Sequence, residues 1–514
     1  MDKRIYNILF HTHTVSSIVI SVALYVIFFA GSFSFFRDEI VNWERGHQVN
    51  TSDQIIVDVD TILLSLSEFY DLSGRDITLT HYYNERQIGV SLTGSKDSTA
   101  TKEAEAAAFF YLDTQNKTSV TYPESYTLGE FLYRLHFFAQ IPYPYGYYLS
   151  GFIAFFFLFA ILTGILVHWK KIISNFYVFR PWAKLKTIWT DSHTALGLIG
   201  FPFQLIYALT GAFFMIKAVV MIPFVIALYD GDEQKLNEDL EYSTPIFEYT
   251  YQPLAKIPPL SSYISNIKDQ WDSFQIKEIQ ISNYGDQNMH LSLAGHLDYR
   301  QKMNGIGKVI YKVKDGEVVS QKNPLKRTTY LDGVKNLLFR LHLADYAGYG
   351  LRIISFLLGI ISCYVILSGV MIWLVARNKK NIPDEGRRFN NKVVKWYLAI
   401  CLSMFPIIAM EFSMVKLIAP VGMTLLYQTF FTTWLVLTII FYSLKDHLSM
   451  LRWMLLLGGV FAIIIPFVNG FTTGNWIWIT WQNELTQILF IDLFWLTLAI
   501  ISLVTWLKIS PLSD

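Results

Sequence analysis

Long apolar runs recur along the chain and alternate with polar segments. Eight of the runs reach about 20 residues, the length that a helix needs to cross a bilayer. We therefore predict eight membrane-spanning helices, at Val15–Phe36, Tyr147–Trp169, Ala195–Ile216, Leu351–Ala376, Val394–Phe412, Val421–Leu444, Met450–Val468 and Leu485–Leu507. The third run stays apolar as far as Tyr229, so we expect a segment in the membrane interface to follow it.

Two long polar segments separate the first four spans. They cover Arg37–Leu135 and Tyr229–Leu341. Apolar and polar residues alternate in parts of both, a pattern typical of half-buried strands. The stretches are Ile77–Thr80, Ile88–Leu92, Ile276–Ile281, Met289–Leu293 and Val309–Val313. We expect each segment to fold as a small α+β domain outside the membrane.

Basic residues concentrate in every second loop. They are Lys3, Arg4, Lys170, Lys171, Arg180, Lys184, Lys186, Arg377, Lys379, Lys380, Arg387, Arg388, Lys392 and Lys395. Cytoplasmic loops carry such an excess, so these loops and both termini are predicted to be cytoplasmic. The two polar segments then face outward, on the opposite side of the membrane.

Composition excludes several classes of protein. Hydrophobic residues make up 53% of the 514 residues and charged residues only 16%, against about 25% charged in a soluble domain. The net charge of +1 gives no sign of nucleic-acid binding. The two cysteines, Cys363 and Cys401, lie in apolar runs, which argues against a disulfide framework, a cysteine-bound iron–sulfur cluster and covalently attached haem.

The first four spans form an internal repeat. His13, Gly31 and Arg37 recur 180 residues later as His193, Gly211 and Lys217. Arg134-Leu135-His136 precedes the second span as Arg340-Leu341-His342 precedes the fourth, and Thr163-Gly164 matches Ser368-Gly369. Both units have the same topology, and such parallel repeats pack around a pseudo-twofold axis along the membrane normal.

This symmetry predicts two pairs of facing histidines. His13 and His193, the inner pair, begin their spans at the cytoplasmic side, and His136 and His342, the outer pair, begin theirs at the opposite side. Neutral imidazoles that face each other suit the two axial positions of haem iron. A single interfacial histidine is usually only a polar anchor, but four related by a repeat favour ligation. The small residues Gly31, Gly164, Gly211 and Gly369 would permit close approach of helices or macrocycle.

The other histidines carry weaker signals. His168, at the cytoplasmic end of the second span, has no symmetric partner and is equally a third-site ligand, a propionate contact or an anchor. His11 could replace His13 as the ligand. His47, His81, His290 and His296 are expected on solvated surfaces of the outward segments, and His447 in a loop.

Four arginines lie near the predicted outer surface: Arg37, Arg134, Arg340 and Arg352. Guanidinium groups suit the carboxylates of haem propionates, and snorkelling at the interface is the competing interpretation. We retain Arg37, Arg134 and Arg340 as candidate cofactor-binding residues. Glu411 and Lys416, at the end of the fifth span, receive no role.

At these residues the chain resembles the PepSY-associated transmembrane family, which includes ferric-siderophore reductases. The similarity rests on the Arg-Leu-His motifs, Thr163–Lys170, Phe179-Arg180-Pro181, Asp191–Gly197, Phe201-Pro202-Phe203 and Thr210-Gly211. It covers about Asn7 to Lys380 and does not extend to the last four spans. Ser17 stands where the family usually has a glycine, which leaves both His11 and His13 open as the ligand.

The resemblance implies two b-type haems and electron flow from cytoplasm to periplasm. His136 and His342 would hold the outer haem, and His13 and His193 the inner one. The implied activity is reduction of a ferric siderophore or other ferric chelate. Six tyrosines near the outer histidines could form a docking rim for it, although an aromatic belt is the ordinary interpretation of interfacial tyrosines: Tyr143, Tyr145, Tyr147, Tyr148, Tyr346 and Tyr349. No nucleotide-binding glycine motif is present, so a cytoplasmic protein or quinol must donate the electrons.

The predicted fold is thus an α-helical polytopic membrane protein with two tandem units, each carrying a PepSY-like α+β domain. Its predicted parts are residues 1–36, 37–135 (first outward domain), 136–193, 194–228, 229–341 (second outward domain), 342–380 and 381–514 (four extra spans). Two alternatives remain open: a siderophore or other small-molecule transporter, and a haem-free binding or regulatory protein that acts through its outward domains.

Overall fold

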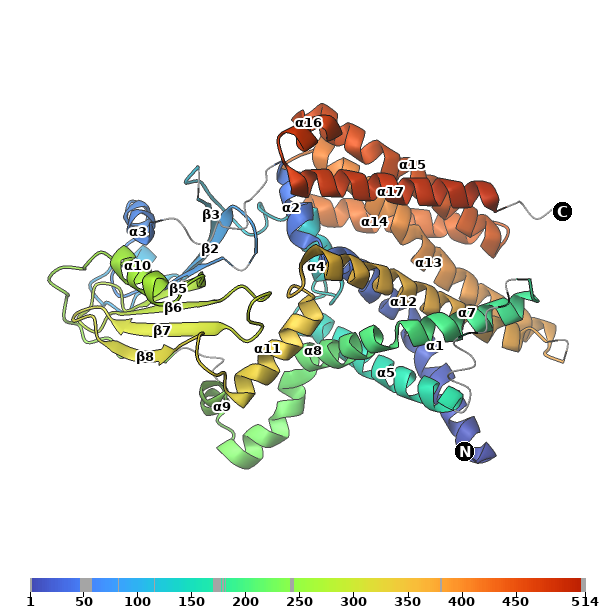
Figure 1. Cartoon of the computed structure of the whole chain (residues 1–514), viewed down its shortest axis with the longest axis horizontal. Coiled ribbons are helices and arrows are strands. Elements are labelled where there is room, and N and C mark those ends of the chain that lie inside the picture. Colours follow the sequence, from blue (N-terminus) through green and yellow to red (C-terminus); the bar gives the residue numbers. More distant parts are fainter. Residues whose placement is uncertain are drawn as a thin grey trace.

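The computed structural model is an elongated molecule with a helical body at one end and a β-sheet at the other (Figure 1). It describes residues 2–46, 58–81, 83–114, 116–169, 177, 180, 182–240, 245–379 and 381–509. His47, Lys170, Lys171, Phe179, Pro181 and Lys380 lie outside these ranges. We call the two ends of the body the sheet end and the termini end, because the first and last described residues lie away from the sheet (Figure 1).

Eight helices in the described ranges are long and apolar enough to cross a membrane, which confirms the predicted number of spans. They are α1 (Lys3–Ser34), α5 (Tyr145–His168), α8 (Phe201–Tyr229), α12 (Gly348–Arg377), α13 (Asp384–Leu417), α14 (Gly422–Ser443), α15 (His447–Thr473) and α17 (Thr486–Lys508). The protein is therefore a multi-pass membrane protein. His447, expected in a loop, is instead the first residue of α15.

The third predicted span, Ala195–Ile216, is divided between two helices. α7 (Leu185–Ile199) ends at Gly200, and α8 begins at the next residue. Pro202 explains the break, because its ring lacks an N–H and crowds the carbonyl one turn before it. α8 then continues to Tyr229 without a second break, so the expected interfacial segment is part of the same helix.

The two outward segments form one antiparallel sheet of eight strands. The first contributes β1 (Ile77–Thr80), β2 (Gln87–Leu92), β3 (Ala108–Asp113) and β4 (Ser119–Val120). The second contributes β5 (Gln275–Ser282), β6 (His290–His296), β7 (Ile306–Lys312) and β8 (Val318–Lys322). The strand order is β4-β3-β2-β1-β5-β6-β7-β8, so each segment contributes four neighbouring strands to the sheet.

This joint sheet differs from the expected pair of separate domains. β1 and β5 pair antiparallel from Ile77 opposite Ile281 to Thr80 opposite Glu278. Each would otherwise be an edge strand with unpaired backbone groups, and pairing satisfies both edges. The helices α3 (Val59–Ser67) and α10 (Ser261–Gln270) add their apolar residues to the same buried core as both sets of strands.

The chain returns from each half of the sheet through a short helix. α4 (Leu128–Leu135) and α11 (Tyr330–Leu343) carry the two Arg-Leu-His motifs at their C-terminal ends. In the body, α1 packs against α5 and α12, α5 against α8, and α7 against α12. The first four spans thus form a closed bundle in which residues related by the repeat face one another.

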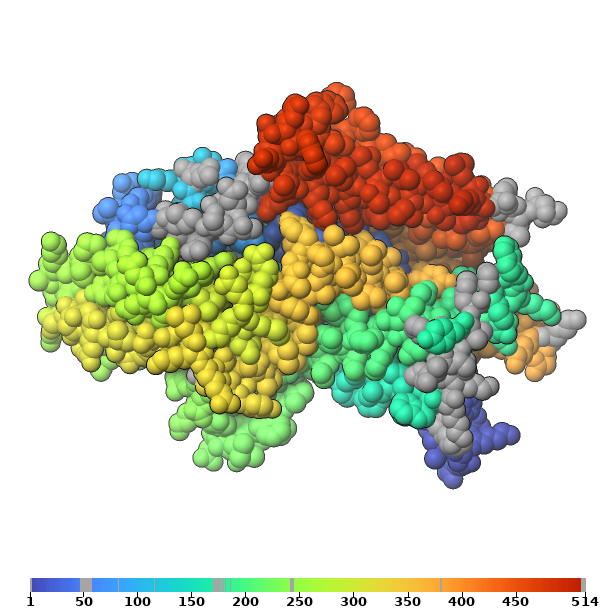
Figure 2. All heavy atoms as spheres, viewed as in Figure 1, coloured from blue at the N-terminus to red at the C-terminus, as the bar shows by residue number. Residues whose placement is uncertain are grey.

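The C-terminal helices form one flank of the body (Figure 2). α13 contacts α1 and α12, and α17 contacts α2 (Arg37–Arg45), the short helix after α1. Phe33 of α1 stacks with Trp495 of α17, and Trp43 of α2 packs on Phe412 of α13. The extra region and the repeat bundle therefore share one apolar core. The remaining described helices are α9 (Glu233–Asp239), α16 (Ile477–Gln482) and the 3-10 helix Lys102–Glu105.

Candidate functional site

The inner pair, His13 on α1 and His193 on α7, faces across the bundle. The ring centres lie 6.4 Å apart, with the ring planes at 75°. His13 Nδ1 lies 2.8 Å from the carbonyl oxygen of Ala160, and His193 Nδ1 lies 3.0 Å from that of Val365. A carbonyl can only accept, so Nδ1 carries the proton in both rings and Nε2 keeps its lone pair free for a metal.

Glycines make room for both inner rings. A Cβ added at Gly164 would lie 3.1 Å from Cε1 of His13, and one added at Gly369 would lie 3.2 Å from Cε1 of His193. The hydroxyls of Thr163 and Ser368, one residue earlier, donate to the same two carbonyls, at 3.1 and 2.8 Å. The hydroxyl–glycine dipeptides of the repeat are thus parts of matching histidine cradles.

Enlarging one cradle should displace its histidine. Gly369→Val adds three carbons against His193, so any haem held by the inner pair should be largely lost while the helices stay folded. Gly197→Ala on the neighbouring α7 is the matched control, because its new Cβ would meet Val365 at an ordinary 3.8 Å. Haem content per chain measures both variants, and full haem content in Gly369→Val would refute this assignment of the cradle.

The outer pair, His136 and His342, has the same spacing at the sheet end. Its ring centres also lie 6.4 Å apart, with the planes at 33°. His136 Nδ1 bonds the carbonyl oxygen of Tyr133, and His342 Nδ1 lies 2.8 Å from Thr210 Oγ1. Thr210 donates its own proton to the Ile206 carbonyl at 2.6 Å, so it accepts from His342. Here too Nε2 is the nitrogen available to a metal.

Burial keeps the outer imidazoles neutral. It lowers the pKa of His136 to about 4, against a smaller opposing effect of the Tyr133 carbonyl. It lowers the pKa of His342 to about 3, with a further contribution from His136. Neutral imidazole is the form that binds metal ions.

The two pairs lie near opposite ends of the bundle. Gly31 lies beside His136, because a Cβ added at Gly31 would be 3.7 Å from the Cβ of His136. Gly31 follows His13 by 18 residues on the same helix. At 1.5 Å per residue this separation is about 27 Å, close to the hydrocarbon thickness of a bilayer. The two pairs are therefore separated along the bundle by about the thickness of a bilayer's hydrocarbon core.

The geometry of both pairs fits a haem. A bond from imidazole nitrogen to a metal is about 2.0–2.1 Å long, so two rings that share one metal hold their centres a little over 6 Å apart. The observed 6.4 Å matches this separation in both pairs. Across the described ranges no group of three or more His, Cys, Asp or Glu side chains could hold a metal ion. Two-histidine sites suit a metal whose other ligands come from a macrocycle.

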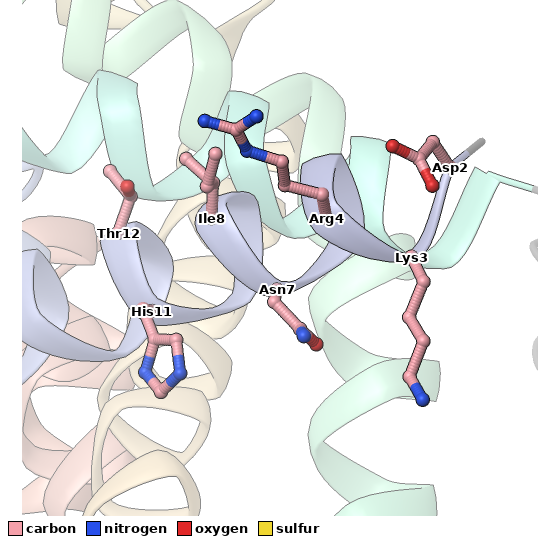
Figure 3. Close-up of a pocket in the computed structure, with 7 residues that line it drawn as sticks. All are labelled: Asp2, Lys3, Arg4, Asn7, Ile8, His11 and Thr12. Atoms are coloured by element: carbon pink, nitrogen blue, oxygen red, sulfur yellow. The ribbon is translucent and has the colours of Figure 1, made fainter.

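The geometry separates His13 from His11. His11 is exposed and lines an open hollow of about 850 Å³ on the first turns of α1 (Figure 3). Its neighbours there are Asp2, Lys3, Arg4, Asn7, Ile8 and Thr12. The structure therefore pairs His13 with His193. His168 follows Gly164 by four residues on α5, which places it on the same face one turn nearer the termini end.

Three histidines of the outward segments are more enclosed than expected. His81 is buried, with Nε2 at 2.8 Å from the Glu85 carbonyl oxygen. His290 is also buried and stacks on Phe247, and His296 stacks on Tyr299. The prediction of solvated surface positions is therefore wrong for His81 and His290. Strand ends packed against neighbouring loops cover these rings, which a local sequence pattern does not reveal.

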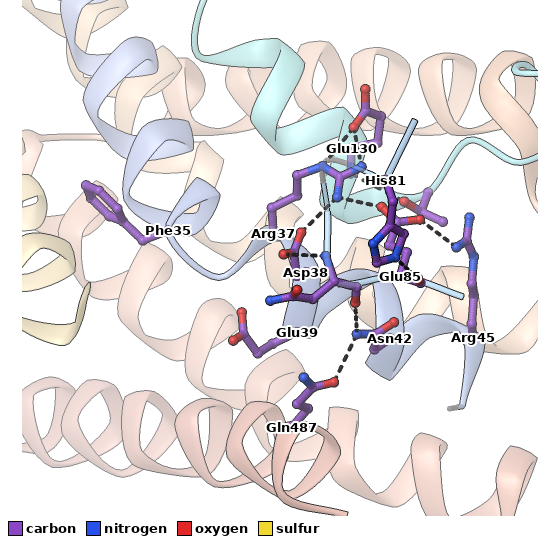
Figure 4. Close-up of polar contacts among 12 residues, drawn as sticks. Phe35, Arg37, Asp38, Glu39, Asn42, Arg45, His81, Glu85, Glu130 and Gln487 are labelled. Carbon is purple, nitrogen blue, oxygen red and sulfur yellow. Dashed lines mark hydrogen bonds and ion pairs between the residues drawn. The ribbon is translucent and has the colours of Figure 1, made fainter. Parts of the chain in front are cut away.

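Arg37 binds carboxylates of the chain itself (Figure 4). Its guanidinium contacts Glu85 at 2.6 Å, Glu130 at 2.7 Å and Asp38 at 2.9 Å. Burial opposes the charge on Glu85, but Arg37 and Arg45 hold its pKa below the ordinary value. With all three guanidinium nitrogens engaged, the expected contact between Arg37 and a propionate is not supported. The cluster instead fixes α2, α4 and the β1–β2 loop to one another.

The other arginines differ in how fully they are engaged. Arg134 donates to Glu130 at 2.7 Å and to Tyr147 Oη at 3.3 Å. Arg352 binds Glu39 and the Phe35 carbonyl. Arg340 is buried over the ring of Tyr299 and binds Asp345, but its Nε has no hydrogen-bond partner among the described residues.

An unsatisfied donor two residues before His342 makes Arg340 the best candidate for binding a propionate. Tyr143 and Tyr145 are 77% and 71% exposed, so they remain available for docking near the outer pair.

Sequence reasoning did not identify the groups that orient the histidines. Thr210 and the carbonyls of Ala160 and Val365 are such groups. The signal was present in one case, because Thr210-Gly211 repeats the hydroxyl–glycine pattern of Thr163-Gly164 and Ser368-Gly369. A backbone carbonyl has no sequence signature at all.

Comparison with known proteins places the repeat bundle in a family. The sequence model described as the PepSY-associated TM region matches residues 10–376, well over half of the chain. An uncharacterized protein of Pseudomonas aeruginosa is 21% identical over 250 residues, which are 46% of this chain. The chain spans 61% of the length of that relative. The four histidines of the two pairs all lie within the matched range, and the chain belongs to the PepSY-associated TM family.

Proposed function

We propose that this protein is a di-haem b oxidoreductase of the bacterial inner membrane. It passes electrons from the cytoplasmic side to the periplasm and reduces ferric iron in siderophore chelates for iron uptake. The observation that carries the proposal is the pair of facing histidines, at one spacing, near each end of the same bundle. The excess of Lys and Arg in alternate loops supports this orientation, with both termini on the cytoplasmic side and the sheet on the periplasmic side.

The protein residues supply ligands and orientation. His13 with His193, and His136 with His342, would hold two b-type haems, whose iron supplies reversible one-electron chemistry. The Nδ1 hydrogen bonds hold each ring in one tautomer and raise the basicity of Nε2. Arg340 offers a donor to a propionate, and the Arg37 cluster fixes α4, and with it His136, beside the sheet.

The proposed reaction needs little more from the protein than a docking surface. One electron converts each ferric ion to Fe(II), which siderophores hold weakly. A chelate too large to enter the bundle can dock on its outer surface, where Tyr143 and Tyr145 present exposed rings. A cytoplasmic protein or quinol is the electron donor, since the chain carries no nucleotide-binding glycine motif.

A visible spectrum of the purified protein tests the proposal. We expect the bands of low-spin b-type haem and a pyridine haemochrome ratio of two haems per chain. The haem should be extractable because the chain has no Cys-x-x-Cys-His motif. A ratio near one haem per chain would mean that one of the two pairs binds no haem. A ratio near three would indicate a further haem at His168, and absence of haem would refute the proposal.

A further inference from the structure

Glu411 is a fully buried carboxyl group in the C-terminal region, on a helix that carries none of the four paired histidines. It lies on α13 with 0% of its surface exposed. Its Oε2 accepts a hydrogen bond from Thr429 Oγ1 on α14 at 3.2 Å. Its Oε1 has no hydrogen-bond partner among the described residues, and no ion pair to Glu411 is found within them.

Glu411 stands at one end of a polar seam between α13 and α14. Eight residues earlier on α13, or about 12 Å along the helix, Ser403 Oγ lies 3.1 Å from Thr438 Oγ1 of α14. Pro406 lies between the two contacts and leaves the Leu402 carbonyl without its usual helical donor. Carboxyl and hydroxyl groups in line inside a membrane bundle are typical of proton paths.

The charged side chains of the surrounding elements are all satisfied elsewhere. On α13 itself, Lys416 donates to the Trp43 carbonyl of α2 and lies 4.5 Å from the Trp43 ring centre. Glu44 of α2 accepts a hydrogen bond from the Leu128 N–H at 2.7 Å. Asp492 of α17 accepts two hydrogen bonds, one from Trp43 Nε1 at 2.8 Å and one from Asn469 Nδ2 of α15 at 2.9 Å. Glu130 of α4 binds Arg37 and Arg134. On α14, Tyr427 Oη lies 3.2 Å from Tyr126 Oη.

Burying a carboxylate without a counter-charge costs a great deal of free energy, and burying the neutral, protonated carboxylic acid costs far less. One carboxyl and one hydroxyl are also too few ligands for Na⁺ or a divalent ion. Glu411 precedes the end of α13 by six residues, or about 9 Å along the helix, so the proton has a short way to the sheet end. We propose that Glu411 is a reversible proton-binding site, at the end of the polar seam between α13 and α14.

Infrared difference spectroscopy of the haem-loaded protein, titrated with acid and base, tests this site. The spectrum of the wild type minus that of Glu411→Gln should show the carbonyl stretch of one protonated carboxylic acid. This band should give way to carboxylate bands as the pH rises and return as it falls. Thr429→Val should keep the band but move its frequency, because it removes the hydrogen bond that Oε2 accepts.

Glu39→Gln is the matched control. Glu39 is also buried but is ion-paired with Arg352, so its removal should take away carboxylate bands only. A Glu411 signal that is carboxylate at every pH would overturn the proposal, and so would a protonated band that never titrates. Haem content of Glu411→Gln, which we expect unchanged, reports separately on its folding. The inference does not depend on the proposed reductase activity.

Discussion

Replacing His342 by alanine should leave the purified protein with one b-type haem per chain instead of two. The substitution removes one of the two proposed ligands of the outer haem, and His136 alone cannot supply both axial positions. The inner pair should keep its haem, because His13 precedes Gly31, the neighbour of His136, by about 27 Å along α1. Reduction of an external ferric chelate should fall by about 100-fold or more, the upper range for changes around a metal site. Haemochrome content and chelate reduction measure the two effects.

His290→Ala is the control for this variant. His290 is buried in the sheet, and its ring stacks on Phe247, so its loss should leave two haems. If His342→Ala loses both haems while remaining a folded monodisperse protein, the pairing is wrong. If it retains both, His342 is not a ligand.

His193→Ala should stop electron entry while the outer haem remains bound. The variant breaks the inner pair, because it removes the ring that faces His13. The two ring centres lie 6.4 Å apart in the wild type. A reductant confined to the termini end should then fail to reduce the remaining haem, whereas one added at the sheet end should still reduce it. Stopped-flow absorbance in sealed, oriented vesicles measures both rates.

His11→Ala is the matched control for the inner pair. His11 is two residues from His13 but lines an exposed hollow (Figure 3), so the variant should behave as the wild type. Wild-type electron entry in His193→Ala would mean that the inner pair is not on the path.

Features set by local periodicity were predictable from the sequence. The eight spans follow from apolar length, and the predicted strand Ile77–Thr80 has the observed bounds of β1. The histidine pairing was predictable because the repeat relates His13 to His193 and His136 to His342. Residues related by a symmetry axis can be expected to face each other without knowledge of any distance in the fold. Pro202 is a counterexample, since its effect on the third span is a local rule that hydropathy alone conceals.

Features that depend on contacts between distant segments were not predictable. The single sheet arises because β1 meets β5, about 200 residues later, and either strand could have paired with another edge. The ion pairs of Arg37, a candidate propionate-binding residue from its predicted place near the outer surface, could not be predicted, because Glu85 and Glu130 are far away in sequence. The burial of Glu411 depends on packing against the C-terminal helices, for which the family resemblance gives no guide.

Reduction of a trapped ferric chelate tests the central claim most directly. Purified protein is reconstituted in sealed vesicles that contain a ferric siderophore and a chromogenic Fe(II) chelator. An impermeant reductant outside the vesicles supplies electrons to those molecules whose termini end faces outward. We predict Fe(II) formation in the lumen that requires haem-loaded protein and is absent with His342→Ala. Haem-loaded wild-type protein that produces no luminal Fe(II), or a His342→Ala variant that produces it at the wild-type rate, would contradict the account.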